Sequence, residues 1–263
     1  MPNALIVGHD SELGLIAANH LISSGWQVFG TTRRESNVIE GKIFYCDLDC
    51  RTSIENALSL VFTELSHLDL VIISVGRLSP ISPILDADFD VWSDAVSLNF
   101  VNQIFVIQQL LRHLAAHQKT GTKFLTFAGS GTNSAPKNYS AYTLSKIALI
   151  KSMELFTAEH SEHFFLSLGT GWMNSAIHKQ TLEAGSLAGD GYLETLRRIE
   201  ENDFGDPKLY CAFLDWYIDV SDPRVSGRNI ALQGDDWQAV EFKSNLIETQ
   251  DSYKLRRGTG MKL

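Results

Sequence analysis

The sequence contains few cysteines, and none of them forms a CxxC pair. The three, Cys46, Cys50 and Cys211, are an odd number, and Cys46 and Cys50 lack a second pair that would complete a zinc site. We therefore expect no metal site, and we expect reduced structural thiols in a cytoplasmic protein.

Basic residues are also fewer than acidic ones: the sequence has 22 Lys and Arg against 31 Asp and Glu, which gives a formal net charge of −9. A protein that binds the phosphate backbone of a nucleic acid usually presents a basic face. The charge balance therefore argues against a nucleic-acid partner, and any basic residue that binds a phosphate must act locally.

No apolar run is long enough to span a membrane. The longest uncharged stretch, residues 95–111, is interrupted by five Asn and Gln residues and falls short of the roughly 20 apolar residues that a span requires. The N-terminus has an apolar run of only four residues and no basic leader, so we predict no signal peptide. A soluble protein without a membrane partner is expected.

The 263 residues, 44% of them apolar, are enough to bury a large core. Short, continuously apolar runs recur with helical patterns between them, as expected for strands covered on both faces. They predict seven strands, at residues 4–7, 27–31, 42–45, 70–73, 123–127, 164–168 and 229–232. The pattern indicates an α/β fold in three layers, with a doubly wound, seven-stranded parallel sheet.

The helical patterns are of two kinds. Residues 13–23 and 53–65 are amphipathic crossovers, whereas residues 89–117 and 139–160 carry apolar side chains around much of their circumference. Helices of the second kind can pack both on the sheet and on a second copy of the chain, which favours a homodimer or homotetramer.

No linker divides the chain, so we expect a single domain over residues 1–263. Residues 177–207 differ from the rest because glycines are spread among charged residues, with one short helical pattern at residues 192–200. We interpret this segment, called the insertion below, as a mobile cover of the substrate site.

The turn after the first predicted strand, residues 8–14, has the features of a phosphate-binding turn. Gly8 permits a tight turn, Gly14 lets the following helix lie close to the sheet, and the free N–H groups of the first helical turn can accept a pyrophosphate. Only two of the three glycines of such a turn are present, so a structural turn with incidental glycines is the alternative.

The second predicted strand leads into Thr32, Arg33 and Arg34. In a dinucleotide-binding fold the end of this strand faces the adenosine ribose, where a carboxylate selects a free 2′-hydroxyl and an arginine accommodates a 2′-phosphate. A guanidinium can also stack on adenine. The pair therefore favours NADP over NAD, with two solvated loop arginines as the alternative.

Tyr142 and Lys146 are four residues apart on one face of a predicted helix. A tyrosine that titrates near 10 is a poor acid or base at neutral pH unless a nearby cation stabilises its phenolate, and Lys146 can supply that charge. The YxxxK spacing alone is common, but here it begins a long helix after the fifth strand, and Ser130 lies 12 residues before the tyrosine.

Over nearly its whole length the sequence resembles the short-chain dehydrogenase/reductase family, in its single-domain NADP-dependent form with a variant glycine-rich turn. The resemblance implies a Rossmann fold and assigns catalysis to Ser130, Tyr142, Lys146 and Asn99. The residues assigned to cofactor binding are Gly8, His9, Asp10, Ser11, Leu13, Gly14, Thr32, Arg33, Arg34, Asp47, Leu48, Ser74, Val75, Gly76, Tyr142, Lys146, Gly171, Trp172 and Met173.

The family's mechanism implies hydride transfer between C4 of the nicotinamide and a carbonyl or carbinol carbon. Tyr142 would protonate the developing alkoxide, and Ser130 would hydrogen-bond the same oxygen. Lys146 would lower the tyrosine pKa and hold the nicotinamide ribose, while Asn99 would anchor a water that relays protons to solvent.

The sequence departs from the family pattern at several positions. Glu12 replaces the second glycine of the turn, where a carboxylate could weaken cofactor binding, and Thr170 replaces a proline. Ser74 and Val75 stand where the family has Asn and Ala. The separation of Ser130 from the tyrosine is one residue shorter than is commonest in the family.

The mixed charge of the insertion does not identify a substrate, and the direction of the reaction is open. A small ketone, a keto-sugar or an acyl-linked keto group all fit, and the tail after residue 234 resembles a variant associated with sugar metabolism. A catalytically inactive NADP-binding redox sensor or scaffold is the alternative function. A nucleotide-sugar epimerase or dehydratase is a further rival, although it normally requires a longer chain.

Overall fold

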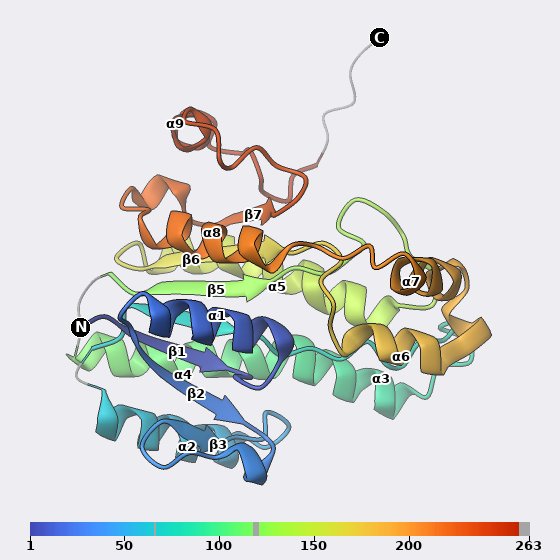
Figure 1. Cartoon of the computed structure of the whole chain (residues 1–263), viewed down its shortest axis with the longest axis horizontal. Helices are drawn as coiled ribbons and strands as arrows, with labels where there is room; N and C mark the ends of the chain where they lie inside the picture. Colours follow the sequence, from blue (N-terminus) through green and yellow to red (C-terminus); the bar gives the residue numbers. More distant parts are fainter. Residues whose placement is uncertain (66, 118–120, 258–263) are drawn as a thin grey trace.

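The structure, a computed structural model, describes residues 1–65, 67–117 and 121–257. Its strands form one parallel sheet in the order β3-β2-β1-β4-β5-β6-β7 (Figure 1). They are β1 (Asn3–Val7), β2 (Gln27–Thr32), β3 (Ile43–Tyr45), β4 (Leu70–Ile73), β5 (Lys123–Phe127), β6 (Phe164–Gly169) and β7 (Arg228–Ala231). The predicted doubly wound, seven-stranded sheet is confirmed, and each strand boundary lies within one residue of its expected place.

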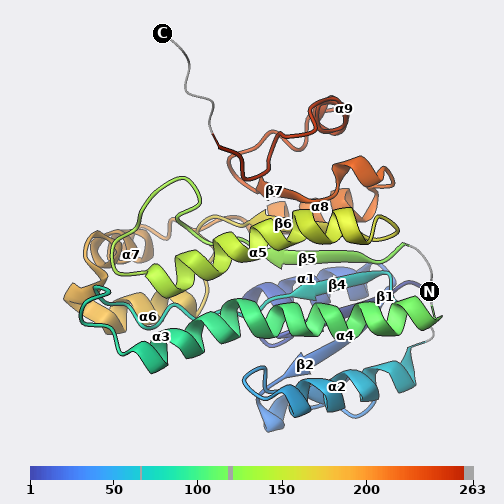
Figure 2. The ribbon, with the colours of Figure 1, turned by 180° about the vertical axis from the view of Figure 1, so that it is seen from behind.

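Helices cover both faces of the sheet. The longer ones are α1 (Glu12–Ser23), α2 (Arg51–Glu64), α3 (Phe89–Val96), α4 (Asn102–His117), α5 (Ser140–Glu159), α6 (Ile177–Ala184), α7 (Asp190–Glu200), α8 (Pro207–Ile218) and α9 (Phe242–Glu248). Figure 1 shows α1 and α8 in front of the sheet, and Figure 2, from behind, shows α4 and α5 in front of it.

Alternate residues of each strand point to opposite faces, so the sheet separates two apolar cores. Ala4 and Ile6 of β1 lie in the core under α1 and α8, whereas Leu5 and Val7 lie in the core under α2, α4 and α5. Because both faces are buried, the strands read as continuous apolar runs rather than alternating ones.

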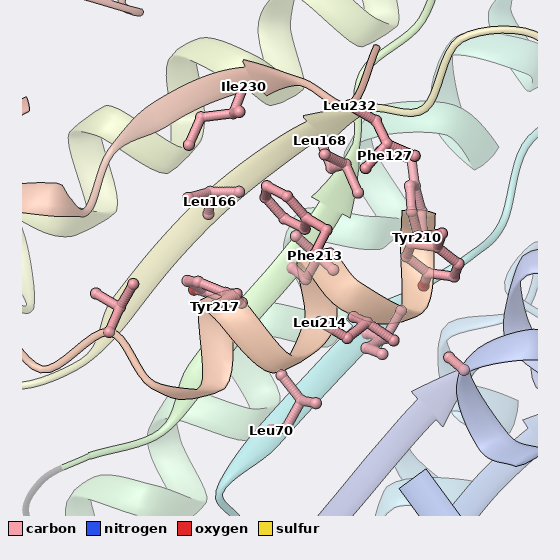
Figure 3. Packing of buried hydrophobic residues seen from close by; sticks show 14 of the residues in the cluster. Leu70, Phe127, Leu166, Leu168, Tyr210, Phe213, Leu214, Tyr217, Ile230 and Leu232 are labelled. Carbon is pink, nitrogen blue, oxygen red and sulfur yellow. The ribbon is translucent and has the colours of Figure 1, made fainter. Parts of the chain in front are cut away.

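Helix α8 was not among the predicted helices, although it covers one face of the sheet beside α1. Its start carries two sequence signals, Pro207 in the first turn and Asp206, whose side chain accepts a hydrogen bond from the N–H of Lys208. Figure 3 shows the buried side chains of this helix against β5, β6 and β7. Tyr217 also donates its hydroxyl to the carbonyl of Phe124 at 3.0 Å, which ties α8 to the sheet.

The long helix expected over residues 89–117 is not uniform. Between α3 and α4 the chain forms a π-helical segment, η2 (Ser97–Val101). Figure 2 shows α3 and α4 continuing one another along the back of the sheet. A π-turn holds one more residue than an α-turn, and such segments frequently occur at functional sites. The apolar periodicity of the sequence did not reveal this interruption.

The insertion folds into α6, the short helix η3 (Gly185–Ala188) and α7, so it holds more helix than the single pattern expected at residues 192–200. Two of its hydrogen bonds reach the loops that follow β4 and β5. Gln180 accepts a hydrogen bond from the N–H of Leu78 at 2.9 Å, and Asn138 donates to the carbonyl of Leu187 at 2.7 Å. The insertion therefore lies on the loops that follow β4 and β5, while its mobility stays a prediction.

Beyond β7 the chain is anchored by a buried arginine. Arg228 is 1% exposed, and its guanidinium donates hydrogen bonds to backbone carbonyls that include those of Thr249 and Arg224. Because it satisfies several carbonyls at once, this side chain holds the segment after α9 against the last strand. The assignment of a single domain over residues 1–263 stays a prediction.

Candidate active site

The candidate site lies at the carboxyl ends of the strands. The strand order reverses between β1 and β4, and ligands of open α/β sheets bind in the crevice outside such a reversal. The turns after the two strands are in contact, because the hydroxyl oxygens of Ser11 and Ser74 lie 2.7 Å apart. A Cβ atom built on Gly8 would lie 2.7 Å from Cγ2 of Val75. The structure thus brings residues 8–14 and residues 74–76 together.

The turn after β1 has the shape and the free donors that an anion requires. A Cβ atom on Gly14 would lie 2.5 Å from the carbonyl oxygen of Gly8, so only glycine fits there. Ser11 caps α1 and accepts a hydrogen bond from the N–H of Gly14 at 3.0 Å. Among the hydrogen bonds of the described residues, none engages the N–H groups of Glu12 and Leu13. This donor set fits the diphosphate of a dinucleotide.

The arginine pair lies at the end of β2. Thr32 is buried and accepts a hydrogen bond from the N–H of Arg34 at 3.0 Å, whereas both arginine side chains are exposed. Nε of Arg34 lies 3.4 Å from Oδ2 of Asp10. Arg33 takes part in no ion pair within the part of the chain that the structure describes. One guanidinium is therefore oriented toward residues 8–14, and the other has its charge free for an anionic ligand.

Asp47 and Leu48, which the family resemblance assigns to cofactor binding, follow β3. Leu48 is buried, and Asp47 is half-buried with its N–H donated to Oγ of Ser53 at 2.9 Å. The neighbouring Asp49 forms an ion pair of 3.1 Å with Arg77, from the loop after β4. Sequence reasoning missed Arg77, because nothing in the sequence indicates that a lone arginine joins two loops.

Asn99 occupies the middle of the π-helical segment and is completely buried. Its Oδ1 accepts a hydrogen bond from the N–H of Arg77 at 2.8 Å, and its Nδ2 donates to the carbonyl of the same residue at 2.7 Å. The side chain therefore fixes the backbone that follows Gly76. A Cβ atom on Gly76 would lie 3.7 Å from Oδ1 of Asn99 and 4.0 Å from Nζ of Lys146, so these three residues gather at one point.

Tyr142 and Lys146 are both buried on α5, and Nζ of Lys146 lies 5.8 Å from the centroid of the tyrosine ring. Burial raises the pKa of Tyr142 to about 12 and lowers the pKa of Lys146 to about 8. The expectation that the lysine lowers the tyrosine pKa is not met, because the desolvation of the phenolate dominates. At neutral pH the phenol therefore keeps its proton, which is the form that can protonate an alkoxide.

The backbone after β5 packs against the tyrosine ring. A Cβ atom on Gly129 would lie 2.5 Å from Cε1 of Tyr142 and 2.8 Å from Cγ of Lys146. Sequence reasoning missed Gly129, although its place directly before Ser130 was a usable signal. Ser130 follows at an exposed position beside this contact, and its catalytic role stays a prediction.

The loop of Gly171, Trp172 and Met173, which the family resemblance assigns to cofactor binding, follows β6. Gly171 has a φ of +68°, a conformation that favours glycine, and Met173 is buried. Trp172 stacks on His178 of α6 with 4.5 Å between the ring centroids and 4° between the planes. The guanidinium of Arg198 from α7 lies 4.8 Å from the centroid of Trp172. The loop is thus joined to both helices of the insertion through one indole ring.

An apolar wall surrounds the tyrosine. Tyr142 belongs to a buried cluster with Leu78, Ile81 and Ala188, against which partly buried side chains pack. The partly buried members of this wall are Tyr139, Ile177, Ala184 and Tyr192. Its members come from the loop after β4, from the start of α5 and from the insertion.

The described residues offer neither a membrane-spanning helix nor a metal site. No helix among them is long and apolar enough to cross a membrane. Over residues 1–65, 67–117 and 121–257, no three His, Cys, Asp or Glu side chains gather as a candidate metal site.

Comparison with known families and proteins gives one family match. The family described as "short chain dehydrogenase" matches residues 2–183. A fatty acyl-CoA reductase of Acinetobacter baylyi is 26% identical over 174 residues, which are 61% of this chain and 58% of that protein. An uncharacterized oxidoreductase of Schizosaccharomyces pombe is 30% identical over 99 residues, 38% of this chain and 37% of that protein. The chain thus spans less than two thirds of either relative.

Solved structures resemble the whole fold. A short chain dehydrogenase/reductase from Saccharomyces cerevisiae has a TM-score of 0.78 at 16% identity, covering 90% of this chain and 98% of that one. An actinorhodin polyketide ketoreductase variant with NADPH has a TM-score of 0.76 at 17% identity, covering 88% and 95%. A 4-hydroxyisoleucine dehydrogenase with NADH has a TM-score of 0.73 at 18% identity, covering 89% and 98%. At these identities the likeness shows the fold alone.

Proposed function

The chain belongs to the short-chain dehydrogenase/reductase family of NAD(P)-dependent oxidoreductases, and from this premise we propose that it reduces a carbonyl compound with NADPH. The observation that carries the proposal is the pair of buried ionisable side chains on α5, Tyr142 and Lys146, beside the backbone of Gly129. Ionisable groups with displaced pKa values in a crevice mark candidate catalytic sites.

Four side chains have separate roles in the proposed reaction. The nicotinamide, when bound, supplies the hydride. Tyr142 gives its phenolic proton to the carbonyl oxygen as negative charge develops there, and the hydroxyl of Ser130 donates a hydrogen bond to the same oxygen. The ammonium of Lys146 holds the ribose of the cofactor and stabilises the phenolate that remains. Asn99 fixes the loop at Gly76 and anchors the proton relay.

A preference for NADP is part of the proposal. Arg33 has no ion-pair partner among the described residues, and Arg34 is drawn toward the cofactor turn by Asp10. A 2′-phosphate beside these guanidinium groups would form charge-assisted hydrogen bonds. The structures that resemble this fold include one with NADPH and one with NADH, so the preference rests on the arginines.

For the substrate we propose a ketone with apolar substituents. The wall around Tyr142 offers aliphatic and aromatic side chains, which suit an apolar chain or ring better than a keto-sugar. The likeness to a protein named a fatty acyl-CoA reductase is in keeping with such a substrate. An acyl-linked keto group fits the same wall.

The alternative is an NADP-binding sensor or scaffold without catalysis. Glu12 in the cofactor turn favours it, whereas the buried Tyr142 and Lys146 oppose it. The homodimer or homotetramer and the cytoplasmic location stay predictions, the first supported by the exposed Leu144 and Leu155 of α5.

The test is a carbonyl-reduction assay on a panel of apolar ketones and keto-sugars, with NADPH and NADH compared. We expect turnover with NADPH on apolar ketones, and Tyr142→Phe should lower kcat by about 10²- to 10⁴-fold while leaving NADPH binding and the melting temperature near those of the wild type. Arg33→Ala should lower the preference for NADPH over NADH about tenfold. NADPH binding with no turnover on any carbonyl, unchanged by the tyrosine substitution, would support the sensor instead.

A further inference from the structure

Glu12 connects the turn at residues 8–14 to the residue that precedes the insertion. It is the first residue of α1, and its Oε1 accepts a hydrogen bond of 3.0 Å from the backbone N–H of Ala176, the residue directly before α6. The two residues are 164 positions apart in the sequence. A carboxylate of the turn therefore lies at the start of a second helix.

This position is electrostatically special because helix N-termini carry partial positive charge and unpaired N–H groups. The N–H groups of Glu12 and Leu13 have no partner among the hydrogen bonds of the described residues, and that of Ala176 is satisfied by the carboxylate. A diphosphate bound at the turn needs the same kind of donors in the same crevice. The carboxylate thus supplies from within the chain the negative charge that the cofactor would bring.

The charge of this carboxylate reaches the first turn of α6. His178, two residues further on, is packed against Trp172. Burial and, less strongly, the positive charge of Arg198 lower its pKa, while its hydrogen bond to the carbonyl of Met173 and, most weakly, the negative charge of Glu12 oppose that shift. Glu12 therefore acts on the first turn of α6 through charge as well as through one hydrogen bond.

We propose that Glu12 is an internal competitor of the cofactor diphosphate, which lowers affinity for the dinucleotide and is released from Ala176 when the diphosphate binds. The inference rests on the proposed use of a dinucleotide. It assigns a function to the residue that interrupts the glycine pattern, because release of the carboxylate frees the start of α6, the helix that contributes Ile177 to the wall around Tyr142.

The test compares three ligands by calorimetry on the full chain. NADPH and ADP-ribose contain the diphosphate, whereas adenosine 2′-monophosphate carries adenine, ribose and the 2′-phosphate without it. Glu12→Gln removes the charge and keeps an oxygen that can accept the N–H of Ala176. The matched control is Glu159→Gln, at an exposed position about 25 Å along α5 from Tyr142.

We expect Glu12→Gln to tighten the binding of NADPH and ADP-ribose by about three- to tenfold, since one charge is removed beside a polyanion in a partly hydrated crevice. Binding of adenosine 2′-monophosphate should stay unchanged, and Glu159→Gln should change none of the three affinities. In hydrogen exchange, NADPH should alter the protection of the amides at the start of α6 in the wild type.

Two results would overturn the inference while leaving the proposed function in place. The first is that the wild type binds NADPH and the Glu12→Gln variant binds it equally well or more weakly. The second is that Glu12→Gln raises the affinity for all three ligands equally, which would indicate a general charge effect. If neither the wild type nor Glu12→Gln binds NADPH, NADH or ADP-ribose, the use of a dinucleotide fails, and this inference fails with it.

Discussion

Asn99 holds the main chain of Arg77 at both of its polar groups, with its Oδ1 2.8 Å from the amide nitrogen and its Nδ2 2.7 Å from the carbonyl oxygen. The contact joins the π-helical segment to the loop after β4. Since Asn99 is completely buried, water cannot replace it without entering the core. The position of Gly76, next to Nζ of Lys146, therefore depends on one amide side chain.

Replacing Asn99 with Ala should lower the free energy of unfolding by about 1–3 kcal/mol, because it removes two hydrogen bonds to the backbone of Arg77 made by a completely buried side chain. Denaturant unfolding measures the loss. Asn56→Ala, at an exposed position of α2, is the control and should stay within about 0.5 kcal/mol of the wild type. Equal stability of the two variants would show that the contact with Arg77 contributes little.

Replacing Gly129 with Ala should damage the site through packing. The new methyl would lie 2.5 Å from Cε1 of Tyr142, so the ring or the backbone must move. We expect a loss of about 1–3 kcal/mol in stability and a lower kcat. Gly234→Ala is the control, since its methyl would lie 3.4 Å from Cβ of Ala231, an ordinary contact. A Gly129→Ala variant with full activity would mean that the ring is free to shift.

Replacing Lys146 with Met should change how stability depends on pH. Burial lowers the lysine pKa from 10.5 to about 8, so between these values the unfolded chain binds more protons than the folded one. The free-energy cost of burying the charged ammonium is fully present below pH 8 and is absent above pH 10.5. From pH 8 to pH 10 the wild type should therefore gain about 2 kcal/mol relative to Lys146→Met.

Urea unfolding at pH 7, 8, 9 and 10 measures this difference. The raised pKa of Tyr142 destabilises both proteins above pH 10, and it cancels in the comparison because both keep the tyrosine. Parallel pH profiles of the two proteins would contradict a lowered lysine pKa in the folded state.

Replacing Ser130 with Ala should lower kcat by about 10²-fold or more if its hydroxyl donates to the reacting oxygen. Ser134→Ala, in the exposed part of the same loop, is the control and should retain activity. The opposite pattern would move the assignment to Ser134. Melting temperatures of both variants should match the wild type, because both side chains are exposed.

The strands were predictable because a sheet that is covered on both faces leaves continuous apolar runs in the sequence. The run at residues 70–73, for example, became β4 with all four residues buried. The π-helical segment was not predictable in this way, because Asn99 lies within a helix whose apolar pattern continues across it. Helix α8 carried its signals in Asp206 and Pro207, but they lay at the edge of a glycine-rich stretch that read as a loop.

The local parts of the site were also predictable, since Tyr142 and Lys146 are adjacent on one helix turn. The contacts of Glu12 with Ala176 and of Arg77 with Asn99 were not, because they join segments that only the fold brings together. The pKa of Tyr142 is raised rather than lowered for a related reason. The sequence gives the neighbouring charge, whereas the degree of burial follows from packing by the loops and the insertion.

Because of the π-turn at residues 97–101, the number of residues between α3 and α4 matters for the site as much as their identity. Deleting one residue there would restore regular α-helical hydrogen bonding, a change that helix propensity alone would favour. It would also rotate α3 by about 100° relative to α4, since each residue of an α-helix turns the chain by that angle. A deletion variant could therefore keep its helix content and its core under α4 while Asn99 turns away from Arg77.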